Sequence, residues 1–449
     1  MAVLSETENP SFGGTLAILL GGCVLVYYAA IVVYRLYFHP LAKYPGPFLA
    51  RISPIPITIS LLRGRIPFFM KSAHDNFGPI VRVSPNELCF DEEMAWKDIY
   101  SSRPADIRQD PIHVGSIAAV PGVSSITMAN DMDHTRQRRA LSQAFSTKAL
   151  PEQEYPVMKY INIVSDKMRE CAAKDGIDFR YWVPLISESI KAGAIEQATR
   201  RVATAGSPPQ TFLQSCIPGR ISETRQKHLD TSREKILNAT NNPNKDFLYY
   251  VMKQQDKGEL NLNEVIVNDA LFIIAGTETT AGFLTGLFNL ITRPENQHIL
   301  SRLKEEIRSN FKSDGDLNFE DLVKLPYMTA VIDEGLRMFP SAPIGFVRTV
   351  PAGGDTVCGH FIPEGFDREN PTDKLGARNA FSLGPRGCIG RNLSYMEMRL
   401  IMGKLLWHND VEMHGDNEIW NPAGDYKNMV VYKNWIKPSL NLRLTPRKF

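Results

Sequence analysis

The stretch Phe381-Ser382-Leu383-Gly384-Pro385-Arg386-Gly387-Cys388-Ile389-Gly390 places one cysteine in a loop rich in glycine, directly before an apolar sequence typical of a helix. A thiolate that binds a metal ion needs a sharply turning backbone, and the three glycines permit such a turn. Its charge must also be offset by N–H donors and nearby cations. The helix expected over Asn392–Trp407 would direct its N-terminal N–H groups toward the sulfur. These features predict that Cys388 is a metal-bound thiolate.

Two neighbours of this cysteine suit the same interpretation. Arg386 can form a bidentate pair with a carboxylate of a bound ligand, because a guanidinium group matches two carboxylate oxygens. Phe381 can cover the thiolate and exclude water. The alternative is an unliganded cysteine in a glycine-rich loop of the phosphate-binding kind, but the stretch lacks the lysine of such loops and their spacing.

Length and composition set broad limits. A chain of 449 residues is long enough for one large domain or two ordinary ones. A formal net charge of +2 gives no indication of nucleic-acid binding. The cysteines show no CxxC spacing, which argues against a zinc ribbon and a disulfide framework and suits a reducing compartment. They are Cys23, Cys89, Cys171, Cys216, Cys358 and Cys388.

A second informative stretch is the apolar run from Val265 to Leu290, which predicts a buried core helix. Its middle, Ala275-Gly276-Thr277-Glu278-Thr279-Thr280, combines a glycine with a carboxylate and hydroxyls. Glycine inside a helix costs about 1 kcal/mol relative to alanine, and it allows another group to approach the backbone closely. The run therefore predicts either a helix that crosses a flat ligand or a helix kinked for packing. A second membrane span is disfavoured by Asp269, Glu278 and Asn289.

The N-terminal segment predicts a membrane anchor after a short tail, residues 1–12. Gly13–Tyr34 has no charged residue and is about 33 Å long as a helix, enough to cross a bilayer. A cleaved signal peptide would have a shorter apolar core and a preceding positive charge. Basic residues follow the span and none precedes it, so the remainder is expected in the cytosol. Residues 35–50, around Tyr44-Pro45-Gly46-Pro47, are expected to form a stiff hinge that sets a domain over 51–449 off the membrane.

Two further helices carry charged residues of interest. The helix expected over Asp133–Phe145 is basic, and its charges form either a solvated face or a site for a buried anionic ligand. These charged residues are His134, Arg136, Arg138 and Arg139. In the helix that begins at Pro326, Glu334 and Arg337 are neighbours at i and i+3. Such a pair contributes little when exposed and would be a structural clamp when buried.

Three of these patterns carry a family resemblance. Phe381-x-x-Gly384-x-Arg386-x-Cys388-x-Gly390 resembles the haem-binding signature of the cytochrome P450 family, and this signature is highly specific. Ala275-Gly276-x-Glu278-Thr279 is similar to the oxygen-activation helix of that family, and Glu334-x-x-Arg337 to its characteristic clamp. The three patterns occur in the family's order, and the resemblance extends from Tyr34 to the C-terminus. The N-terminal anchor resembles that of microsomal members of the family. The residues of the chain resemble those of fungal secondary-metabolism enzymes such as averantin and isotrichodermin hydroxylases.

The resemblance implies a fold and a haem site. The fold would be mainly α with small β-sheets, the cytochrome P450 fold, preceded by one transmembrane helix. Cys388 would be the axial ligand of the iron of haem b, and Glu278 and Thr279 would be an acid–alcohol pair that hydrogen-bonds bound dioxygen and delivers protons. Glu334 and Arg337 would form the clamp. The other residues implied at the haem are Phe381, Gly384, Arg386, Gly390, Gly276, Arg138 and His134, of which the last two would face a propionate.

The resemblance also implies a function. The protein would be a monooxygenase of the endoplasmic reticulum membrane with a cytosolic catalytic domain. It would use O2 to hydroxylate or epoxidise an apolar secondary metabolite of polyketide, terpenoid or peptide origin. Segments 341–346 and 103–130 would line the substrate pocket, although the second is equally interpretable as a surface loop. Electrons would come from NADPH through cytochrome P450 reductase, because the sequence shows no flavin or nicotinamide site. The basic residues suggested for reductase docking are Arg136, Arg139 and Arg391.

The sequence departs from the family between Arg337 and Cys388, which are 51 positions apart, several tens fewer than in relatives. We interpret residues 365–380 as irregular and shortened, without a central strand, a short helix and the Pro-Glu-Arg-Phe-like motif whose arginine completes the clamp. Loss of that strand would expose a sheet edge. A second shortening is expected near residues 187–188. The alternative function is therefore a degenerate, non-catalytic membrane protein of the same ancestry. A haem protein that only rearranges its substrate is disfavoured by the intact acid–alcohol pair.

Overall fold

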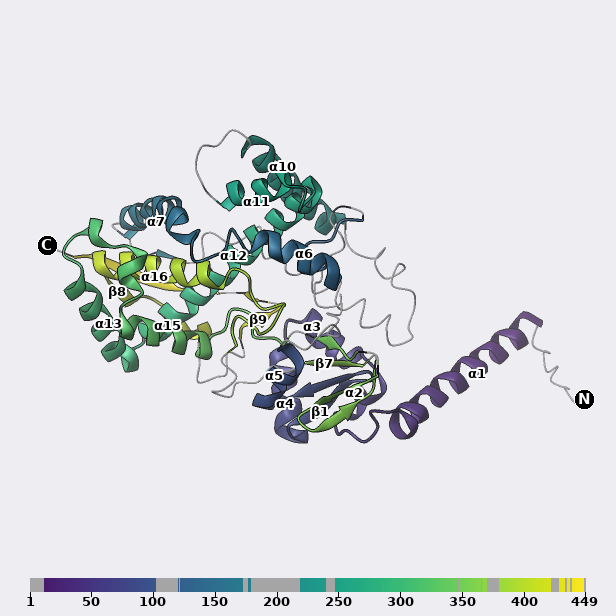
Figure 1. Cartoon of the computed structure of the whole chain (residues 1–449). Helices are drawn as coiled ribbons and strands as arrows, with labels where there is room; N and C mark the ends of the chain where they lie inside the picture. Colours follow the sequence, from purple (N-terminus) through teal and green to yellow (C-terminus); the bar gives the residue numbers. More distant parts are fainter. Residues whose placement is uncertain are drawn as a thin grey trace, which may run out of the picture.

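A computed structural model defines the fold, and four small sheets accompany its many helices (Figure 1). This architecture confirms the predicted fold class, mainly α with small β-sheets. The structure describes residues 12–101, 120, 122–172, 177–178, 219–239, 247–345, 347–351, 353–364, 366–369, 379–420, 428–432, 434–436 and 438–447.

The helices follow one another along the chain with few strands between them. They are α1 (Phe12–Val33), the π-helix η1 (Tyr34–Phe38), α2 (Phe48–Ile52), α3 (Ile55–Leu62), α4 (Ile66–Phe77), α5 (Glu93–Tyr100), α6 (Asp131–Leu141), α7 (Leu150–Ala172), α10 (Gly219–Ala239), α11 (Phe247–Asp256), α12 (Leu262–Ile291), η3 (Pro294–Asn296), α13 (Gln297–Asn310), η4 (Asp314–Asp316), α14 (Phe319–Leu322), α15 (Pro326–Met338), α16 (Arg391–His408) and η6 (Glu418–Trp420).

The strands are short. They are β1 (Ile80–Ser84), β2 (Glu87–Phe90), β3 (Ile177–Asp178), β4 (Arg348–Thr349), β5 (Asp355–Val357), β6 (His360–Ile362), β7 (Asp367–Glu369), β8 (Asn409–Met413), β9 (Val430–Val431), β10 (Trp435–Ile436) and β11 (Asn441–Pro446). The sheets have the strand orders β1-β2-β7-β4, β3-β11-β8, β10-β9 and β5-β6. A turn at Pro85-Asn86 joins β1 to β2, and a turn at Cys358-Gly359 joins β5 to β6.

Helix α1 stands apart from the rest of the protein and extends away from the helical body as a straight rod (Figure 1). Most of its described side chains are apolar and exposed, among them Leu19, Leu25 and Val26. The stretch Ile18–Phe38 is long and apolar enough to cross a membrane, and none of it is buried against the remainder. The helix therefore matches the expected anchor in position and character, and its insertion in a membrane stays a prediction.

The segment after the anchor packs into the domain. Leu41 and Tyr44 are buried, and Arg82 N donates to Pro45 O at 2.7 Å. A Cβ on Gly46 would lie only 2.3 Å from Arg82 O, so this close approach of two backbones requires glycine. The apolar side chains of Leu41 and Tyr44 thus pack into the core, and the segment forms a packed joint with β1. The expectation that residues 35–50 hold the domain off the membrane stays a prediction.

The side chain of Arg82 fastens this joint. Its Nε and Nη2 donate to Pro85 O at 3.1 and 2.9 Å, and its Nη1 donates to Arg35 O, at the end of the anchor, at 2.7 Å. The residue is fully buried, and burial followed by the charges of Arg51 and Arg35 lowers its pKa to about 10. One guanidinium therefore satisfies buried carbonyls from two segments.

We expect Arg82→Met to lower the free energy of unfolding by about 2–4 kcal/mol, because two carbonyls lose their donors in a buried environment. Urea unfolding followed by circular dichroism measures this change. Lys71→Met is the matched control, since Lys71 pairs with Asp75 on the surface, with side chains 61% and 58% exposed. The control should change the stability by less than about 0.5 kcal/mol. Equal effects of the two substitutions would contradict the joint.

One strand was not expected from the sequence. β7 lies between β2, which it pairs with in parallel, and β4, which it pairs with in antiparallel fashion. The expectation that the shortened segment lacks this central strand and exposes a sheet edge is therefore wrong. Residues 367–369 have no apolar alternation, so the strand conformation comes from backbone pairing on both sides rather than from intrinsic preference. Residues 370–378 and 187–188 lie outside the described residues.

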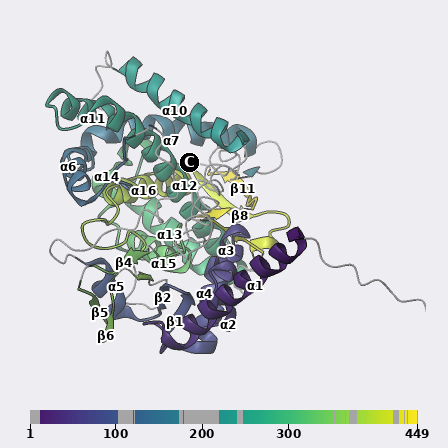
Figure 2. The same ribbon diagram turned by 90° about the vertical axis from the view of Figure 1, so that its right-hand side faces the viewer.

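The largest apolar core joins α12 to α13, α15 and α16. Phe283 of α12 is buried with Ile332 of α15 and Leu406 of α16. A Cβ on Gly335 would lie 2.7 Å from Leu287 Cδ1, so glycine lets α15 approach α12. Although α12 is long and apolar enough to cross a membrane, half of that stretch is buried inside the protein. It runs through the helical body, with α10 and α11 on the side away from β1 and β2 (Figure 1, Figure 2), as the predicted core helix should.

Candidate functional site

The loop around Cys388 turns tightly against the end of α5. Within it, Cys388 N donates to Phe381 O at 2.8 Å and Gly387 N donates to Gly384 O at 3.0 Å. Gly384 has a φ of +69°, and a Cβ there would lie 2.0 Å from Tyr100 O. The left-handed backbone and the close carbonyl both restrict this position to glycine. The loop therefore has the sharp turn that its glycines predict.

The Cys388 side chain is accessible to water, although protein atoms surround its sulfur. Burial raises the pKa of the thiol, while the N–H of Gly390, which donates to the sulfur, and the charges of Arg138 and Arg391 act in the opposite direction. An N–H donor and nearby cations are the groups that stabilise a thiolate. The thiol is thus held by the protein and still reachable by a metal ion.

Two residues of α6 face this loop. Arg138 Nη1 donates to Gly387 O, the carbonyl directly before Cys388, at 2.7 Å. His134 lies one turn earlier on the same face and is buried. Burial, followed by the charges of Arg386 and Arg138, lowers the pKa of His134 to about 4, so the imidazole is neutral at physiological pH. The structure brings both predicted residues to the cysteine loop.

The two predicted side chains of the loop make contacts within the chain. Arg386 Nη2 donates to Ala129 O at 3.0 Å and pairs with Asp131 Oδ1 at 2.8 Å, and the Arg386 side chain is only 9% exposed. We expected this guanidinium to pair with a carboxylate of a ligand, and in the structure Asp131 is a carboxylate partner. Phe381 stacks against Tyr395 of α16, with ring centroids 5.3 Å apart, so it fastens the loop to that helix.

The centre of α12 is open on one side. Ala275, Gly276 and Thr277 are exposed within a helix that is otherwise largely buried, and a Cβ on Gly276 would have no atom within 4 Å. Glu278 is buried, and Thr279 Oγ1 donates to Ala275 O at 2.7 Å. In the part of the chain that the structure describes, no atom packs against Gly276, so the alternative of a glycine required for packing has no support there. A flat group can approach the backbone at this point.

Phe145 connects the cysteine loop with α12. Its Cε1 lies 3.7 Å from the place of a Cβ on Gly390, and its ring centroid is 5.3 Å from that of Phe272 on α12. Phe272 precedes Gly276 by about one helical turn. The accessible Cys388 and the open face of α12 therefore border the same region of the protein.

The structure also shows an acid–alcohol contact that the sequence analysis missed. Thr280 Oγ1 donates to Glu397 Oε2 at 3.1 Å, which links α12 to α16. Burial raises the pKa of Glu397 to about 7, and the Thr280 hydroxyl acts in the opposite direction. A single glutamate in a helix is normally interpreted as a solvated residue, so the only available indication was its position between Met396 and Met398, both buried.

We expect Glu397→Gln to remove part of the pH dependence of stability. In the wild type burial raises the pKa of the folded carboxyl to about 7 from its ordinary value of 4.5, so stability falls as the pH rises through this interval. Glutamine keeps an oxygen for Thr280 and does not titrate. At about pH 8 the free energy of unfolding of the variant should exceed that of the wild type by about 2 kcal/mol, a value reduced because Glu397 retains some contact with water. At about pH 4 the two free energies should be equal.

Urea unfolding at the two pH values measures this difference. Glu320→Gln is the control, because the Glu320 side chain is 88% exposed and its substitution should leave the pH dependence unchanged. A difference between the Glu397 variant and the wild type that is the same at both pH values would show that the effect is not titration.

Glu334 and Arg337 pair on α15 with Nε–Oε2 and Nη2–Oε1 distances of 2.9 and 2.6 Å. The Glu334 side chain is 53% exposed and that of Arg337 is 26% exposed. Both residues also make further contacts, so the role of the pair as a structural clamp stays a prediction. A polar contact between α15 and α16 is made by Tyr395 OH, which donates to Asp333 Oδ1 at 2.8 Å.

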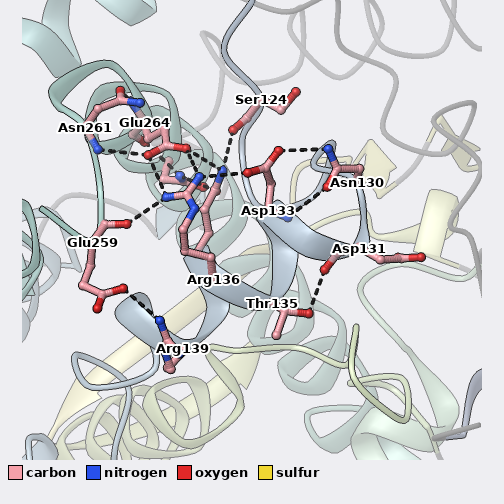
Figure 3. Close-up of polar contacts among 12 residues, drawn as sticks. Ser124, Asn130, Asp131, Asp133, Thr135, Arg136, Arg139, Glu259, Asn261 and Glu264 are labelled. Carbon is pink, nitrogen blue, oxygen red and sulfur yellow. Dashed lines mark hydrogen bonds and ion pairs between the residues drawn. The ribbon is translucent and has the colours of Figure 1, made fainter. Parts of the chain in front are cut away.

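The three arginines suggested for reductase docking differ in their ion pairs and in their exposure to solvent. Arg136 is held by Glu264, with an Nη2–Oε1 distance of 2.5 Å, and Arg139 pairs with Glu259 at 3.0 Å (Figure 3). The Arg139 side chain is nevertheless 72% exposed, and Arg391 is exposed as well. Arg136 is therefore committed to a contact within the chain, with its side chain 34% exposed, whereas Arg139 and Arg391 are exposed.

Known proteins resemble this chain over nearly its whole length. The profile of the family described as Cytochrome P450 matches residues 217–368 and 359–434. Cytochrome P450 monooxygenase aba2 of Botryotinia fuckeliana is 34% identical, over 93% of this chain and 92% of that protein. Cytochrome P450 monooxygenase ABA2 of Pyricularia oryzae is 33% identical over 97% of each chain. Cytochrome P450 monooxygenase astJ of Aspergillus oryzae is 32% identical over 93% of this chain and 94% of that protein.

These relatives extend the agreement from the loop to the whole chain. The alignment with the Botryotinia protein runs over 490 positions, more than the 449 residues present, so it contains gaps on the side of this chain. The similarity nevertheless includes the segments that form the cysteine loop, α6 and α12. The profile match and relatives of this identity and coverage, together with the tightly turned, accessible cysteine, show that the chain belongs to the cytochrome P450 family.

Proposed function

We propose that the protein is a haem-thiolate monooxygenase that hydroxylates or epoxidises an apolar secondary metabolite. The observation that carries this proposal is the accessible thiol of Cys388 beside the open centre of α12. The residues present fit haem b: a thiol for the iron, a glycine without a neighbour at Gly276, and Arg138 with the neutral His134 for the anionic propionates. When bound, haem would supply the activation of O2, and a thiolate ligand favours cleavage of the O–O bond.

Glu278 and Thr279 would handle protons on α12. The Thr279 hydroxyl donates its own proton to Ala275 O at 2.7 Å, which leaves lone pairs on Oγ1 to accept a hydrogen bond from a ligand. Glu278 is adjacent in sequence and buried. The acid and the alcohol proposed to deliver protons are therefore neighbours at the open stretch of the helix.

The substrate would lie between this stretch and residues 341–345. Ser341 Oγ donates to Thr279 O at 2.6 Å, which brings this segment against α12. The residues that follow it are the apolar Ala342, Pro343 and Ile344. An apolar metabolite of polyketide, terpenoid or peptide origin suits such a lining. Of the second segment expected here, residues 102–119 lie outside the described residues.

Electron supply and location complete the proposal. Cytochrome P450 reductase would deliver electrons from NADPH, and the exposed Arg139 and Arg391 offer cations to an acidic partner. The apolar helix α1 would anchor the protein in the endoplasmic reticulum membrane with the domain in the cytosol. Exposed apolar side chains of α2 and α3, next to the anchor, suit contact with the same membrane. They include Phe48, Leu49, Ile55 and Ile59.

One experiment tests the proposal against a degenerate, non-catalytic protein of the same ancestry. The full chain is purified, reduced under carbon monoxide and examined in the Soret region. A red-shifted band typical of thiolate-bound haem is the expected result. Protein without haem, or with an unshifted band, would support the degenerate alternative. Turnover with reductase, NADPH and a panel of apolar metabolites then identifies the substrate class.

A further inference from the structure

The carboxylate of Glu264, in the first turn of α12, collects donors from two helices (Figure 3). Arg136 of α6 approaches it through both terminal nitrogens, Nη1 to Oε2 at 3.1 Å and Nη2 to Oε1 at 2.5 Å. Asn261 N donates to Oε2 at 2.9 Å as part of a capping box, and Gln137 Nε2 donates to Oε1 at 3.3 Å. The Glu264 side chain is only 8% exposed. This is a bidentate, charge-assisted contact in which the carboxylate is buried and the Arg136 side chain is 34% exposed.

The network continues inward through Asn268, one helical turn along α12. Asn268 Nδ2 donates to Gln137 Oε1 at 3.0 Å, and Asn268 Oδ1 accepts from Ile126 N at 2.8 Å. Gln137 Nε2 also donates to Ser124 O at 2.9 Å. Gln137 and Asn268 are fully or almost fully buried. Buried polar groups that satisfy one another in this way fix a single arrangement of the helices they join.

The network fixes the rotation of α6 about its axis. Asp133, Arg136 and Gln137 are spaced i, i+3 and i+4 and form the face toward α12. His134 and Arg138 are spaced i and i+4 and form a neighbouring face. From that second face Arg138 Nη1 donates to Gly387 O at 2.7 Å, one residue before Cys388. A change on the first face must therefore move the donor on the second.

We propose that Glu264 is a positioning residue for the Cys388 ligand: its contact with Arg136 orients α6 so that Arg138 holds the cysteine loop. The inference rests on the proposed function, because it takes Cys388 as the haem ligand. Glu264 touches neither the loop nor the open centre of α12, and it acts through Arg136, the body of α6 and Arg138.

The test uses Glu264→Gln in the full-length holoprotein. Glutamine keeps the shape but loses the charge that draws both guanidinium nitrogens, while Arg136 keeps its contacts with Asp133 Oδ1 at 3.1 Å and Glu259 O at 2.8 Å. We expect amide hydrogen exchange in the peptide containing residues 384–390 to become about tenfold faster. We also expect a smaller share of red-shifted carbon monoxide complex and a changed reduction potential, since both depend on the thiolate and its hydrogen bonds.

Asp314→Asn provides the matched control. Asp314 pairs with Lys404, whose side chain is 5% exposed, and with His408, at the end of α16 remote from the cysteine loop. Its substitution removes a comparable ionic contact and should reduce global stability without changing exchange in the loop or the spectrum. If both variants change the loop in proportion to their loss of stability, Glu264 has only a structural role and the inference is wrong.

A double-mutant cycle with Arg138→Gln tests whether Glu264 affects the cysteine loop through Arg138. Because Glu264 is proposed to act through Arg138, the double variant should show little more loop exchange than Arg138→Gln alone. Additive effects would contradict the proposed route. The exchange readout also separates the two proposals. A wild type without the red-shifted band refutes the haem-thiolate function, whereas a wild type with the band and an unchanged Glu264→Gln loop refutes only the positioning role.

Discussion

Replacing Cys388 with serine is expected to abolish the red-shifted carbon monoxide band and to lower turnover by on the order of 10³-fold or more, equivalent to about 4 kcal/mol in the activation free energy. A hydroxyl group has almost the size of a thiol but is a weak ligand for haem iron, and it does not supply the electron density of a thiolate. The loop itself should survive, because its turn is set by backbone hydrogen bonds such as that from Cys388 N to Phe381 O. The spectrum of the reduced protein under carbon monoxide and the rate of product formation measure the two effects.

Cys23→Ser is the matched control for this substitution. Cys23 is also an exposed cysteine, but it lies on α1, away from the cysteine loop. Its replacement should leave the band and the turnover unchanged. An unaltered band in the Cys388 variant would mean that another group binds the iron, and the assignment of the ligand would be wrong.

Gly384→Ala is expected to dislodge the cysteine loop, to lower the free energy of unfolding by about 2–5 kcal/mol and to cause loss of bound haem. Two costs add at this position. The φ of +69° is unfavourable for alanine by about 1–2 kcal/mol. The new Cβ would also lie 2.0 Å from Tyr100 O, so the loop or the end of α5 must shift, at a further cost of about 1–3 kcal/mol.

Gly258→Ala separates these two costs. Gly258 has a φ of +75°, and a Cβ there would have no atom within 4 Å. Its substitution should therefore show only the backbone cost, about 1–2 kcal/mol, and should leave haem binding intact. Urea unfolding and the haem content of the purified proteins provide the measurements. If the two alanine variants lose equal stability and both retain haem, then the contact with Tyr100 does not hold the loop.

Much of the site follows from local sequence, because its requirements are local. The sharp turn before Cys388 needs glycine at fixed spacing, and the following helix provides the N-terminal N–H groups. The open centre of α12 follows similarly, since Gly276 stands within an otherwise apolar helix. The neighbouring pair Glu278 and Thr279 is adjacent in sequence, so no folding is required to bring it together.

Contacts between distant segments could not be inferred in this way. The strand at 367–369 has no apolar alternation, and only pairing with β2 and β4 makes it a strand. Arg136 has the same charge as a docking residue, and only the position of Glu264 shows that it forms an ion pair within the chain. Glu334 and Arg337 form the predicted pair, yet their exposure depends on what the rest of the chain places over them.

The sequence by itself determined the family, the ligand loop, the core helix and the apolar N-terminal helix. Each of these features depends on a pattern of a few to about twenty-five consecutive residues, because glycine placement and apolar periodicity are local properties of the chain. The tertiary structure decided which partners the charged and titratable side chains meet: Gly387 O for Arg138, Glu264 for Arg136 and the Thr280 hydroxyl for Glu397. The physical reason is that the free energy of a charge depends on its burial and its partners, and both come from segments far away in the chain.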